Sequence, residues 1–347
     1  MPADVPTPPT APADDVTAPA AIQLAKGKGG ASHPSKRRPA RQRVDYQAAR
    51  AALDGVAATP GVAKPDAVLV ASGVRRSFGG LTAVDVDRLE VQRGVITGLI
   101  GPNGAGKTTL FNLLTGFDRP DTGSWSLEGR SLSGLPAHRV AQVGLVRTFQ
   151  LTKALSRLTV LENMLLGAQG QRGESFFTSL LPFAWRGEER ANTTTALGLL
   201  ERFGLAAKAH DLAGEMSGGQ RKLLEMARAL MTDPEVLCLD EPMAGVNPAL
   251  TQSILTHVKT LREDGLTIVF VEHDMDVIRD VSDWVVAMAQ GSVVAEGPPD
   301  TILRDPRVID AYLGAHHDAP LSREEEEAIL GQAAASIAAE TGSEATA

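Results

Sequence analysis

A glycine-rich run that begins at Gly101 has the residue types and the spacing needed to hold phosphate groups. It fits the pattern G-x-x-x-x-G-K-[ST] of a phosphate-binding loop at every fixed position. The glycines let the backbone wrap closely around phosphate oxygens, and the amides of the next helix point at them. Lys107 would neutralise the β- and γ-phosphates of a nucleotide, and Thr108 would ligate Mg²⁺. The nucleotide-binding residues that this run predicts are Gly101, Pro102, Asn103, Gly104, Ala105, Gly106, Lys107, Thr108 and Thr109.

Two carboxylates, Asp240 and Glu241, directly follow an apolar run at residues 236–239. In phosphate-loop proteins a carboxylate at such a strand end holds Mg²⁺, so we expect Asp240 to be a metal ligand together with Thr108. Glu241 is expected at the mouth of the same site, where its carboxylate could polarise an attacking water. An ordinary acidic pair at a strand-to-loop turn is the alternative, and the phosphate loop upstream favours the catalytic interpretation.

A second helix start with anion-binding character is formed by Ser217, Gly218, Gly219 and Gln220. The strongly helical run 221–231 follows it. Ser217 is a good helix cap, and the two glycines leave backbone amides free to meet an anion. Because one chain already has a phosphate loop, a second such helix start makes sense if it completes the site of a facing subunit. A plain loop-to-helix junction is the alternative.

His273 ends a second apolar run, at residues 266–271, after the intervening Glu272. A histidine at a strand end beside a nucleotide can hydrogen-bond the γ-phosphate and orient water. A lone histidine at a strand end is more often structural, but its order behind the other motifs favours the catalytic role. The catalytic residues predicted from this spacing are Lys107, Glu241 and His273.

The elements that must position these residues follow from the apolar pattern. The run 95–100 reads as a strand ahead of the phosphate loop, and 110–114 reads as the helix behind it. Continuous apolarity at 236–239 and 266–271 suits parallel strands that are covered on both faces. Further strands are expected at 67–71 and 81–84, and helices at 159–166, capped by Thr159, and at 196–203, with a loop-rich insertion at 167–187.

Composition narrows the class of protein. The 347 residues suffice for a full α/β core, and the net charge of −8 argues against a general nucleic-acid binder. The single cysteine, Cys238, lies in an apolar run, which indicates a packed thiol in a reducing compartment. We find neither a run of about 18–20 uncharged apolar residues nor the apolar core of a signal peptide. These features predict a soluble, cytoplasmic protein whose membrane role, if any, comes through a partner.

Three segments are expected along the chain. Residues 1–66 are rich in Pro and Ala and hold 10 of the 21 prolines and one aromatic residue, Tyr46. They are predicted to be a disordered basic extension, because they offer too little apolar surface to offset the ordering entropy. Its basic cluster could touch anionic lipid, although a solvated tail without a specific role is favoured. An ordered domain would span 67–316, and an acidic, Ala-rich tail with a frayed helix would span 317–347.

With these motifs in their order, residues 67–315 resemble the ATP-binding subunits of ABC transporters. Residues 216–220 match the family signature Leu-Ser-Gly-Gly-Gln with one conservative change. The resemblance makes Glu241 the catalytic carboxylate and His273 the switch histidine. It places Gln150 in the Q-loop, as a catalytic and Mg²⁺-sensing residue, and Phe78 against the adenine of ATP. The implied fold is a P-loop NTPase (RecA-like) α/β core with a parallel sheet, an antiparallel β-subdomain and an inserted helical subdomain at about 150–225.

Subgroup features point to importers of branched-chain and other hydrophobic amino acids. Asn247 stands where much of the superfamily has Asp, and Asn is usual in that subgroup. The runs Arg-Thr-Phe-Gln at 147–150, Leu-Thr-Gly-Phe at 114–117 and Tyr-Leu-Gly at 312–314 agree. Urea or amide importers, lipopolysaccharide-type exporters and soluble ABC ATPases that act on ribosomes or DNA are the alternatives. A regulatory module with a dead site is disfavoured by the intact catalytic residues.

The resemblance also implies an assembly and a location. Two ATP-binding subunits, identical or different, would sandwich two MgATP molecules head to tail, each between one phosphate loop and the other chain's Ser217–Gln220 helix. The helical subdomain would receive a cytoplasmic helix of integral-membrane permease subunits, and an extracytoplasmic substrate-binding protein would take part indirectly. The chain is thus expected at the cytoplasmic face of the membrane, held there by the permease, with no nucleic acid among its partners.

Overall fold

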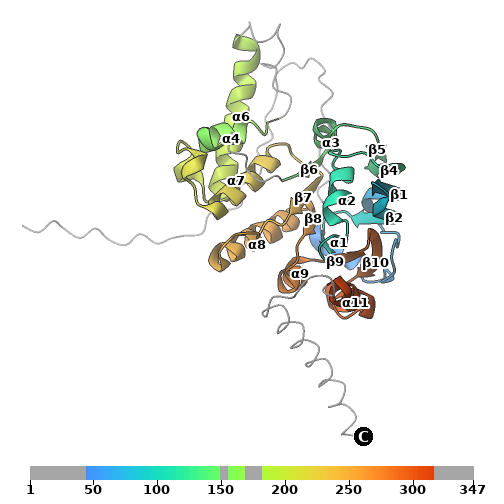
Figure 1. Ribbon diagram of the computed structural model, residues 1–347. Coiled ribbons are helices and arrows are strands. Elements are labelled where there is room, and N and C mark those ends of the chain that lie inside the picture. Colours follow the sequence, from blue (N-terminus) through green and yellow to red (C-terminus); the bar gives the residue numbers. More distant parts are fainter. Residues whose placement is uncertain (1–43, 149–154, 169–181, 316–347) are drawn as a thin grey trace, which may run out of the picture. The chain divides into compact units, whose positions relative to one another are not determined.

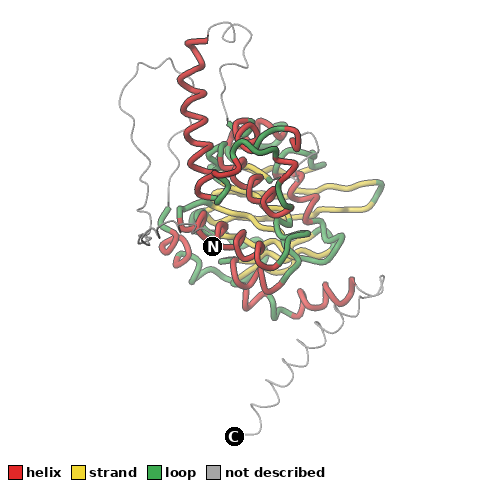
Figure 2. Tube along the Cα trace, turned by 90° about the vertical axis from the view of Figure 1, so that its left-hand side faces the viewer, coloured by secondary structure: helices red, strands yellow, loops and turns green. Residues whose placement is uncertain are grey.

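The computed structural model describes residues 44–148, 155–168 and 182–315, and a six-stranded sheet organises them (Figures 1 and 2). The strands are β3 (Ile96–Ile100), β6 (Leu145–Arg147), β7 (Val236–Asp240), β8 (Thr267–Val271), β9 (Trp284–Ala289) and β10 (Ser292–Gly297). Their order is β10-β9-β3-β8-β7-β6. Every pairing from β9 to β6 is parallel, and β10 pairs antiparallel with β9. The predicted parallel sheet is therefore confirmed.

Alternate residues of the central strands enter two different cores. Leu237 and Leu239 of β7 pack with the helical part of the molecule, whereas Val236 and Cys238 pack on the opposite face. All four are buried, so the strand is covered on both sides, as its continuous apolarity requires. Burial raises the pKa of the Cys238 thiol to about 12, which agrees with a packed, unreactive thiol.

A second, antiparallel sheet lies on one of these faces. Its strands are β1 (Ala67–Phe78), β2 (Leu81–Gln92), β4 (Thr122–Leu127) and β5 (Arg130–Ser131), in the order β2-β1-β4-β5. The sheet shares its core with helix α2 (Lys107–Leu114) and with one face of the parallel sheet. The expected antiparallel β-subdomain is present.

Three helices form the helical part at the other side of the parallel sheet, as Figure 1 shows: α4 (Val160–Leu165), α6 (Pro182–Arg202) and α7 (Gly218–Leu230). They contact one another, and α7 also contacts α8 (Pro248–Glu263). Thr159 caps α4 with a reciprocal capping box, as predicted. Helix α6 begins within the segment that we expected to be a loop, because its first turns carry little apolar periodicity. The other elements are α3 (Ala137–Val143), α9 (Met275–Val281), α10 (Pro299–Ile302), α11 (Pro306–Ala315) and the short 3₁₀ turns η1 (Leu155–Arg157), η3 (Ala206–Lys208) and η4 (Ala213–Glu215).

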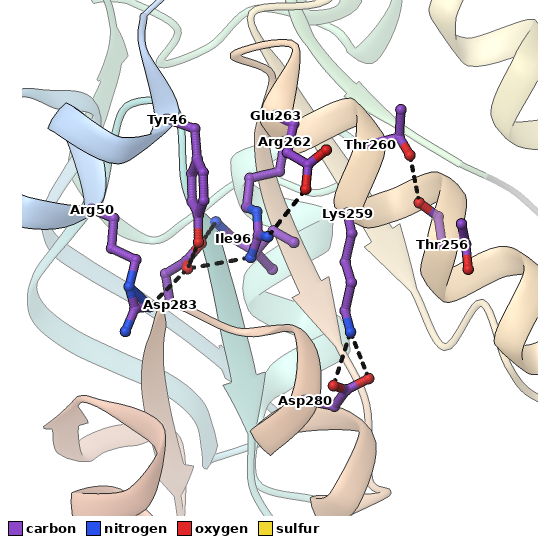
Figure 3. Close-up of polar contacts among 10 residues, drawn as sticks. All are labelled: Tyr46, Arg50, Ile96, Thr256, Lys259, Thr260, Arg262, Glu263, Asp280 and Asp283. Carbon is purple, nitrogen blue, oxygen red and sulfur yellow. Dashed lines mark hydrogen bonds and ion pairs between the residues drawn. The ribbon is translucent and has the colours of Figure 1, made fainter. Parts of the chain in front are cut away.

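The predicted domain boundary at residue 66 is wrong. Residues 44–66 are folded onto the domain and do not belong to a disordered extension. Helix α1 (Tyr46–Ala51) begins at Asp45, whose side chain caps it. Figure 3 shows how α1 is anchored: Tyr46 Oη and Arg50 Nη1 both donate to Asp283 Oδ1, at 2.9 and 3.1 Å. The guanidinium of Arg262 stacks 4.0 Å from the Tyr46 ring centroid. Polar side chains attach this segment together with a few buried apolar ones, among them Ala49 and Leu53, and the low overall apolar content of the region did not predict them.

A second anchor follows at residues 62–64. Lys64 Nζ donates to Glu296 Oε2 at 2.8 Å, and both side chains are fully buried. Trp284 Nε1 donates to the same oxygen at 3.0 Å, and the Lys64 ammonium lies 4.5 Å from the Trp284 ring centroid. The backbone amide of Lys64 donates to Glu90 at 2.6 Å. Both charged groups of this pair are hydrogen-bonded, which is the usual condition for burying charge.

The expected disordered start at 1–43 and the tail at 317–347 lie outside the described residues. Within the described ranges, no helix is long and apolar enough to cross a membrane.

Candidate nucleotide-binding site

The phosphate loop joins β3 to α2 and contains the predicted nucleotide-binding residues. Gly101, Gly104 and Gly106 have φ angles of 149°, 80° and 99°, which L side chains rarely adopt. A Cβ atom at Gly101 would lie 2.2 Å from the carbonyl oxygen of Met288, and one at Gly106 would lie 2.4 Å from that of Ala83. Both ends of the loop therefore have no room for a side chain, whereas position 104 is open.

The amides at the start of α2 are available to a phosphate. Leu110 N donates to Gly106 O, but the amides of Lys107, Thr108 and Thr109 have no acceptor among the described residues. First-turn amides lack partners inside their own helix, and the helix dipole adds positive potential there. This geometry fits the triphosphate of a nucleotide.

Lys107 is buried and turned back along the loop. Its Nζ donates to the carbonyl oxygens of Gly101 and, at 3.0 Å, of Pro102. An ammonium has three hydrogens, so one remains for a phosphate oxygen. Burial lowers the pKa of Lys107, and the nearby carboxylates of Glu241 and Asp240 act in the opposite direction. The structure thus brings these three predicted site residues together.

Asp240 lies at the carboxyl end of β7 and forms an ion pair with Arg147 of β6. Arg147 also donates from Nη1 to Asn112 Oδ1. In the sequence, Arg147 stood out only as a subgroup feature, and the structure adds it to the site. Its position directly before the Thr-Phe-Gln run was the available signal.

The donor set fits a Mg²⁺ ion that is held mainly by its nucleotide. Among the described residues no group of three or more His, Cys, Asp or Glu side chains could hold a metal by itself. Mg²⁺ is usually bound by one or two carboxylates together with phosphate oxygens and waters. Thr108 is exposed at the end of the loop, and its hydroxyl and the Asp240 carboxylate are the protein ligands that such a site would need.

Glu241 is held in an unusual backbone conformation. Its φ is 45°, its side chain is exposed, and its amide donates to Val271 O of β8 at 3.0 Å. Non-glycine residues with positive φ cost energy and are concentrated at functional sites. The conformation turns the chain at the end of β7, directly after the metal-ligand candidate.

Glu272, which the sequence analysis missed, links Glu241's loop to His273. It is buried; its Oε1 accepts from Met243 N at 3.1 Å, and its Oε2 lies 3.7 Å from His273 Nδ1. Burial raises the pKa of Glu272, although the hydrogen bond from the Met243 amide and the nearby His273 lower it. His273 itself is exposed at the end of β8. A carboxylate at the end of an otherwise apolar strand was the signal in the sequence.

The signature residues lie on α7, whose packing partners are α4, α6 and α8. Ser217 caps the helix as predicted: its Oγ accepts from Gln220 N at 3.3 Å, and Gln220 Oε1 accepts from Ser217 N at 3.1 Å. Gly218 is exposed with open space around it, whereas a Cβ at Gly219 would lie 1.6 Å from Leu250 Cδ2. No hydrogen bond among the described residues joins this helix start to the phosphate loop.

Phe78 lies at the end of β1 and is 48% exposed. The guanidinium of Arg76 covers its ring at 4.6 Å from the centroid. The turn after it leads into β2, whose Ala83 approaches the loop at Gly106. An exposed ring on the strand hairpin that approaches the loop is compatible with stacking on a base. Gln150 lies outside the described residues.

A cavity of about 320 Å³ lies between β6 and the helical part. Glu225 of α7 lines it and is only 4% exposed. Burial raises the pKa of the Glu225 carboxyl to about 7, although Lys222 and Arg228 lower it. The lining is mixed in character and consists of Val146, Arg147, Thr148, Leu155, Leu166, Gly167, Glu225, Arg228, Ala229 and Thr232.

Glu225 predicts a pH dependence of stability. Its folded-state pKa is raised, so its contribution to stability is complete below about pH 4.5 and is lost as the pH rises to about 7. We expect Glu225→Gln to gain stability relative to the unmodified protein between pH 5 and 8, by at most about 3 kcal/mol. Urea unfolding at several pH values measures this gain. The exposed Glu201→Gln is the control, and parallel pH profiles for Glu225→Gln and the parent would contradict the prediction.

Taken together, the phosphate loop, the carboxylates at the end of β7 and the histidine at the end of β8 define a P-loop nucleotide hydrolase. Comparison with known proteins specifies the class. Residues 84–244 match the ABC transporter family, and residues 292–318 match the branched-chain amino acid ATP-binding cassette transporter family. The chain belongs to the ATP-binding cassette proteins of ABC transporters, and it is an ATPase.

Individual relatives match this chain over almost their whole length. The chain is 41% identical over 248 residues to a probable branched-chain amino acid transport ATP-binding protein, LivG, of Archaeoglobus fulgidus, covering 72% of this chain and 96% of the relative. It is 41% identical to the high-affinity branched-chain amino acid transport ATP-binding protein BraF of Pseudomonas aeruginosa, covering 71% and 98%. Among solved structures, the ADP conformation of MJ1267, an ATP-binding cassette of an ABC transporter, superposes with a TM-score of 0.64 at 37% identity, covering 72% and 99%.

Proposed function

We propose that this chain is the motor subunit of an ABC importer for branched-chain or related amino acids. The observation that carries the proposal is the 41% identity, over nearly their full length, to relatives named for branched-chain amino acid transport. The intact set of Lys107, Asp240, Glu241 and His273 supports a working motor. Two such subunits would meet head to tail, and each Ser217–Gln220 helix start would complete the partner's site. The exposure of Ser217 and Gly218 at the start of α7 supports this arrangement.

In this proposal each predicted site residue has a defined role. The loop amides and Lys107 bind and orient the phosphates, while Thr108 and Asp240 hold Mg²⁺. The metal supplies charge neutralisation at the transferring phosphoryl group. Glu241 positions the attacking water and takes its proton, and His273, steadied by Glu272, contacts the γ-phosphate. Phe78 stacks on the adenine, and Gln150 senses the metal and the permease.

The cavity beside Glu225 is the proposed seat of the permease. It lies between the nucleotide-binding sheet and the helical part, so a segment docked there would contact both. Arg147 lines the cavity and also pairs with Asp240, which gives a direct route from the docked segment to the metal site. We place the subunit at the cytoplasmic face of the membrane, held by permease subunits, with a substrate-binding protein acting indirectly.

Trapping the assembled complex tests this proposal. We would express Glu241→Gln in the native host, purify it in mild detergent with MgATP, and identify the co-purifying proteins by mass spectrometry. We expect two polytopic permease subunits and a second ATP-binding subunit. The substrate-binding protein of that system would then be tested for binding of leucine-like ligands.

The other outcomes separate the alternatives. Permease subunits whose binding protein prefers urea or amides would replace the proposed cargo but keep the importer. Export partners for lipopolysaccharide would reverse the direction of transport. A soluble homodimer alone, or ribosomes, would discard the transport role while leaving the ATPase in place.

A further inference from the structure

The C-terminal helix α11 reaches the phosphate loop through one side chain. Tyr312 Oη accepts a hydrogen bond from the backbone amide of Gly101 at 2.7 Å. The two residues are 211 positions apart in the sequence. Gly101 is buried, so this hydroxyl satisfies an amide that water does not reach freely. The Tyr-Leu-Gly run had served only as a subgroup feature.

The carbonyl group of the same residue accepts a hydrogen bond from Lys107. The carbonyl oxygen of Gly101 accepts from Lys107 Nζ, while its amide is held by Tyr312. On its third side, Gly101 faces the carbonyl oxygen of Met288 without room for even a Cβ atom. Gly101 is thus held by Tyr312 of α11, by the close approach of Met288 in β9 and by Lys107. The two peptide groups that flank Gly101 are joined at its Cα atom, so a shift of the first would displace the carbonyl acceptor in the second.

We propose that Tyr312 is a positioning residue for ATP binding, which holds Gly101 through its amide so that the Gly101 carbonyl stays in place and Lys107 presents its remaining N–H to the phosphates. Tyr312 acts through Gly101 and is not itself a catalytic residue. Burial raises the pKa of its hydroxyl to about 12, so the group stays neutral throughout the physiological range. The C-terminal family region at 292–318 is then part of the nucleotide site, through a helix that the motif pattern did not connect with it.

The variant Tyr312→Phe tests the role with a minimal change, because it keeps the ring and removes only the hydroxyl. The buried Gly101 amide loses its acceptor, which favours other conformations of the loop. We expect KM and the dissociation constant for ATP to rise about tenfold while kcat changes less than about threefold, the pattern of lost uniform binding. ATPase kinetics and equilibrium titration with a fluorescent ATP analogue give both quantities.

The other tyrosine of the chain supplies a matched control. Tyr46→Phe also removes a hydroxyl hydrogen bond, to Asp283, but that bond lies at α1 rather than at the loop. We expect Tyr46→Phe to lower the melting temperature without changing the KM for ATP. If both variants raise KM equally, or if Tyr312→Phe leaves KM and ATP affinity unchanged, the positioning role is wrong.

A measurement on the unmodified protein makes the test independent of how the variant folds. Hydrogen–deuterium exchange, resolved to single residues by fragmentation, compares the Gly101 amide with the amide of the exposed Gly104. The proposal requires Gly101 to exchange much more slowly than Gly104 before nucleotide is added, and Tyr312→Phe to remove that protection. Equal exchange at the two glycines would overturn it.

Discussion

Replacing Glu241 by Gln is expected to lower kcat for ATP hydrolysis by at least about 100-fold while ATP binding is retained. The amide has the size of the carboxylate but cannot take a proton from water. The positive φ of Glu241 and the hydrogen bond from its amide to Val271 O hold this side chain at the end of β7. There its negative charge raises the pKa of Lys107. The protein should then accumulate as an ATP-bound dimer, which size-exclusion chromatography with MgATP measures.

The exposed Glu263→Gln, on α8, is the control and should hydrolyse ATP normally. Normal turnover in Glu241→Gln would remove Glu241 from the catalytic role. A variant that fails to bind ATP would show instead that the carboxylate shapes the loop.

Replacing Asp283 by Ala is expected to destabilise the protein by about 3–5 kcal/mol. The carboxylate is 1% exposed and accepts from Tyr46, Arg50, Arg262 and the amide of Ile96. Its removal leaves the largely buried guanidinium of Arg262 and a buried amide without their acceptor. It also releases α1 from the domain, so the loss of stability should be accompanied by faster proteolysis near residue 46.

Asp280 offers a matched comparison in the same region (Figure 3). Its carboxylate accepts from Lys259 Nζ at 2.8 Å, but its side chain is 52% exposed. Exposed pairs contribute about 0–1 kcal/mol, so Asp280→Ala should unfold at nearly the parent's urea concentration. Equal destabilisation by the two substitutions would mean that burial does not determine the strength of the α1 anchor.

The sequence predicted the parallel sheet and the short-range geometry well, because both depend on local pattern. Continuous apolar runs led to β7 and β8, and the caps at Thr159 and Ser217 followed from neighbouring residues. The motifs also marked Lys107, Asp240 and Glu241, which the fold brings together at the carboxyl ends of β3 and β7, on either side of β8.

Contacts between distant segments could not be predicted in this way. Lys64 belongs to a stretch whose composition resembles a linker, and only the fold reveals that Glu296 lies beside it. Tyr312 and Gly101 are likewise joined only by the tertiary structure. Such pairs leave no periodic pattern, because each partner lies alone in its own segment.

The contact between Gly219 and Leu250 has a mechanical consequence. Leu250 lies in the first turn of α8, which Asn247 caps six positions after Glu241, and it fills the space that a side chain at 219 would need. The first turns of α7 and α8 are therefore in direct contact, with no room for a side chain between them. The helix start that we propose to complete a neighbouring subunit's site is therefore packed, within one chain, against the segment that follows the chain's own Glu241, so a movement of one requires a movement of the other.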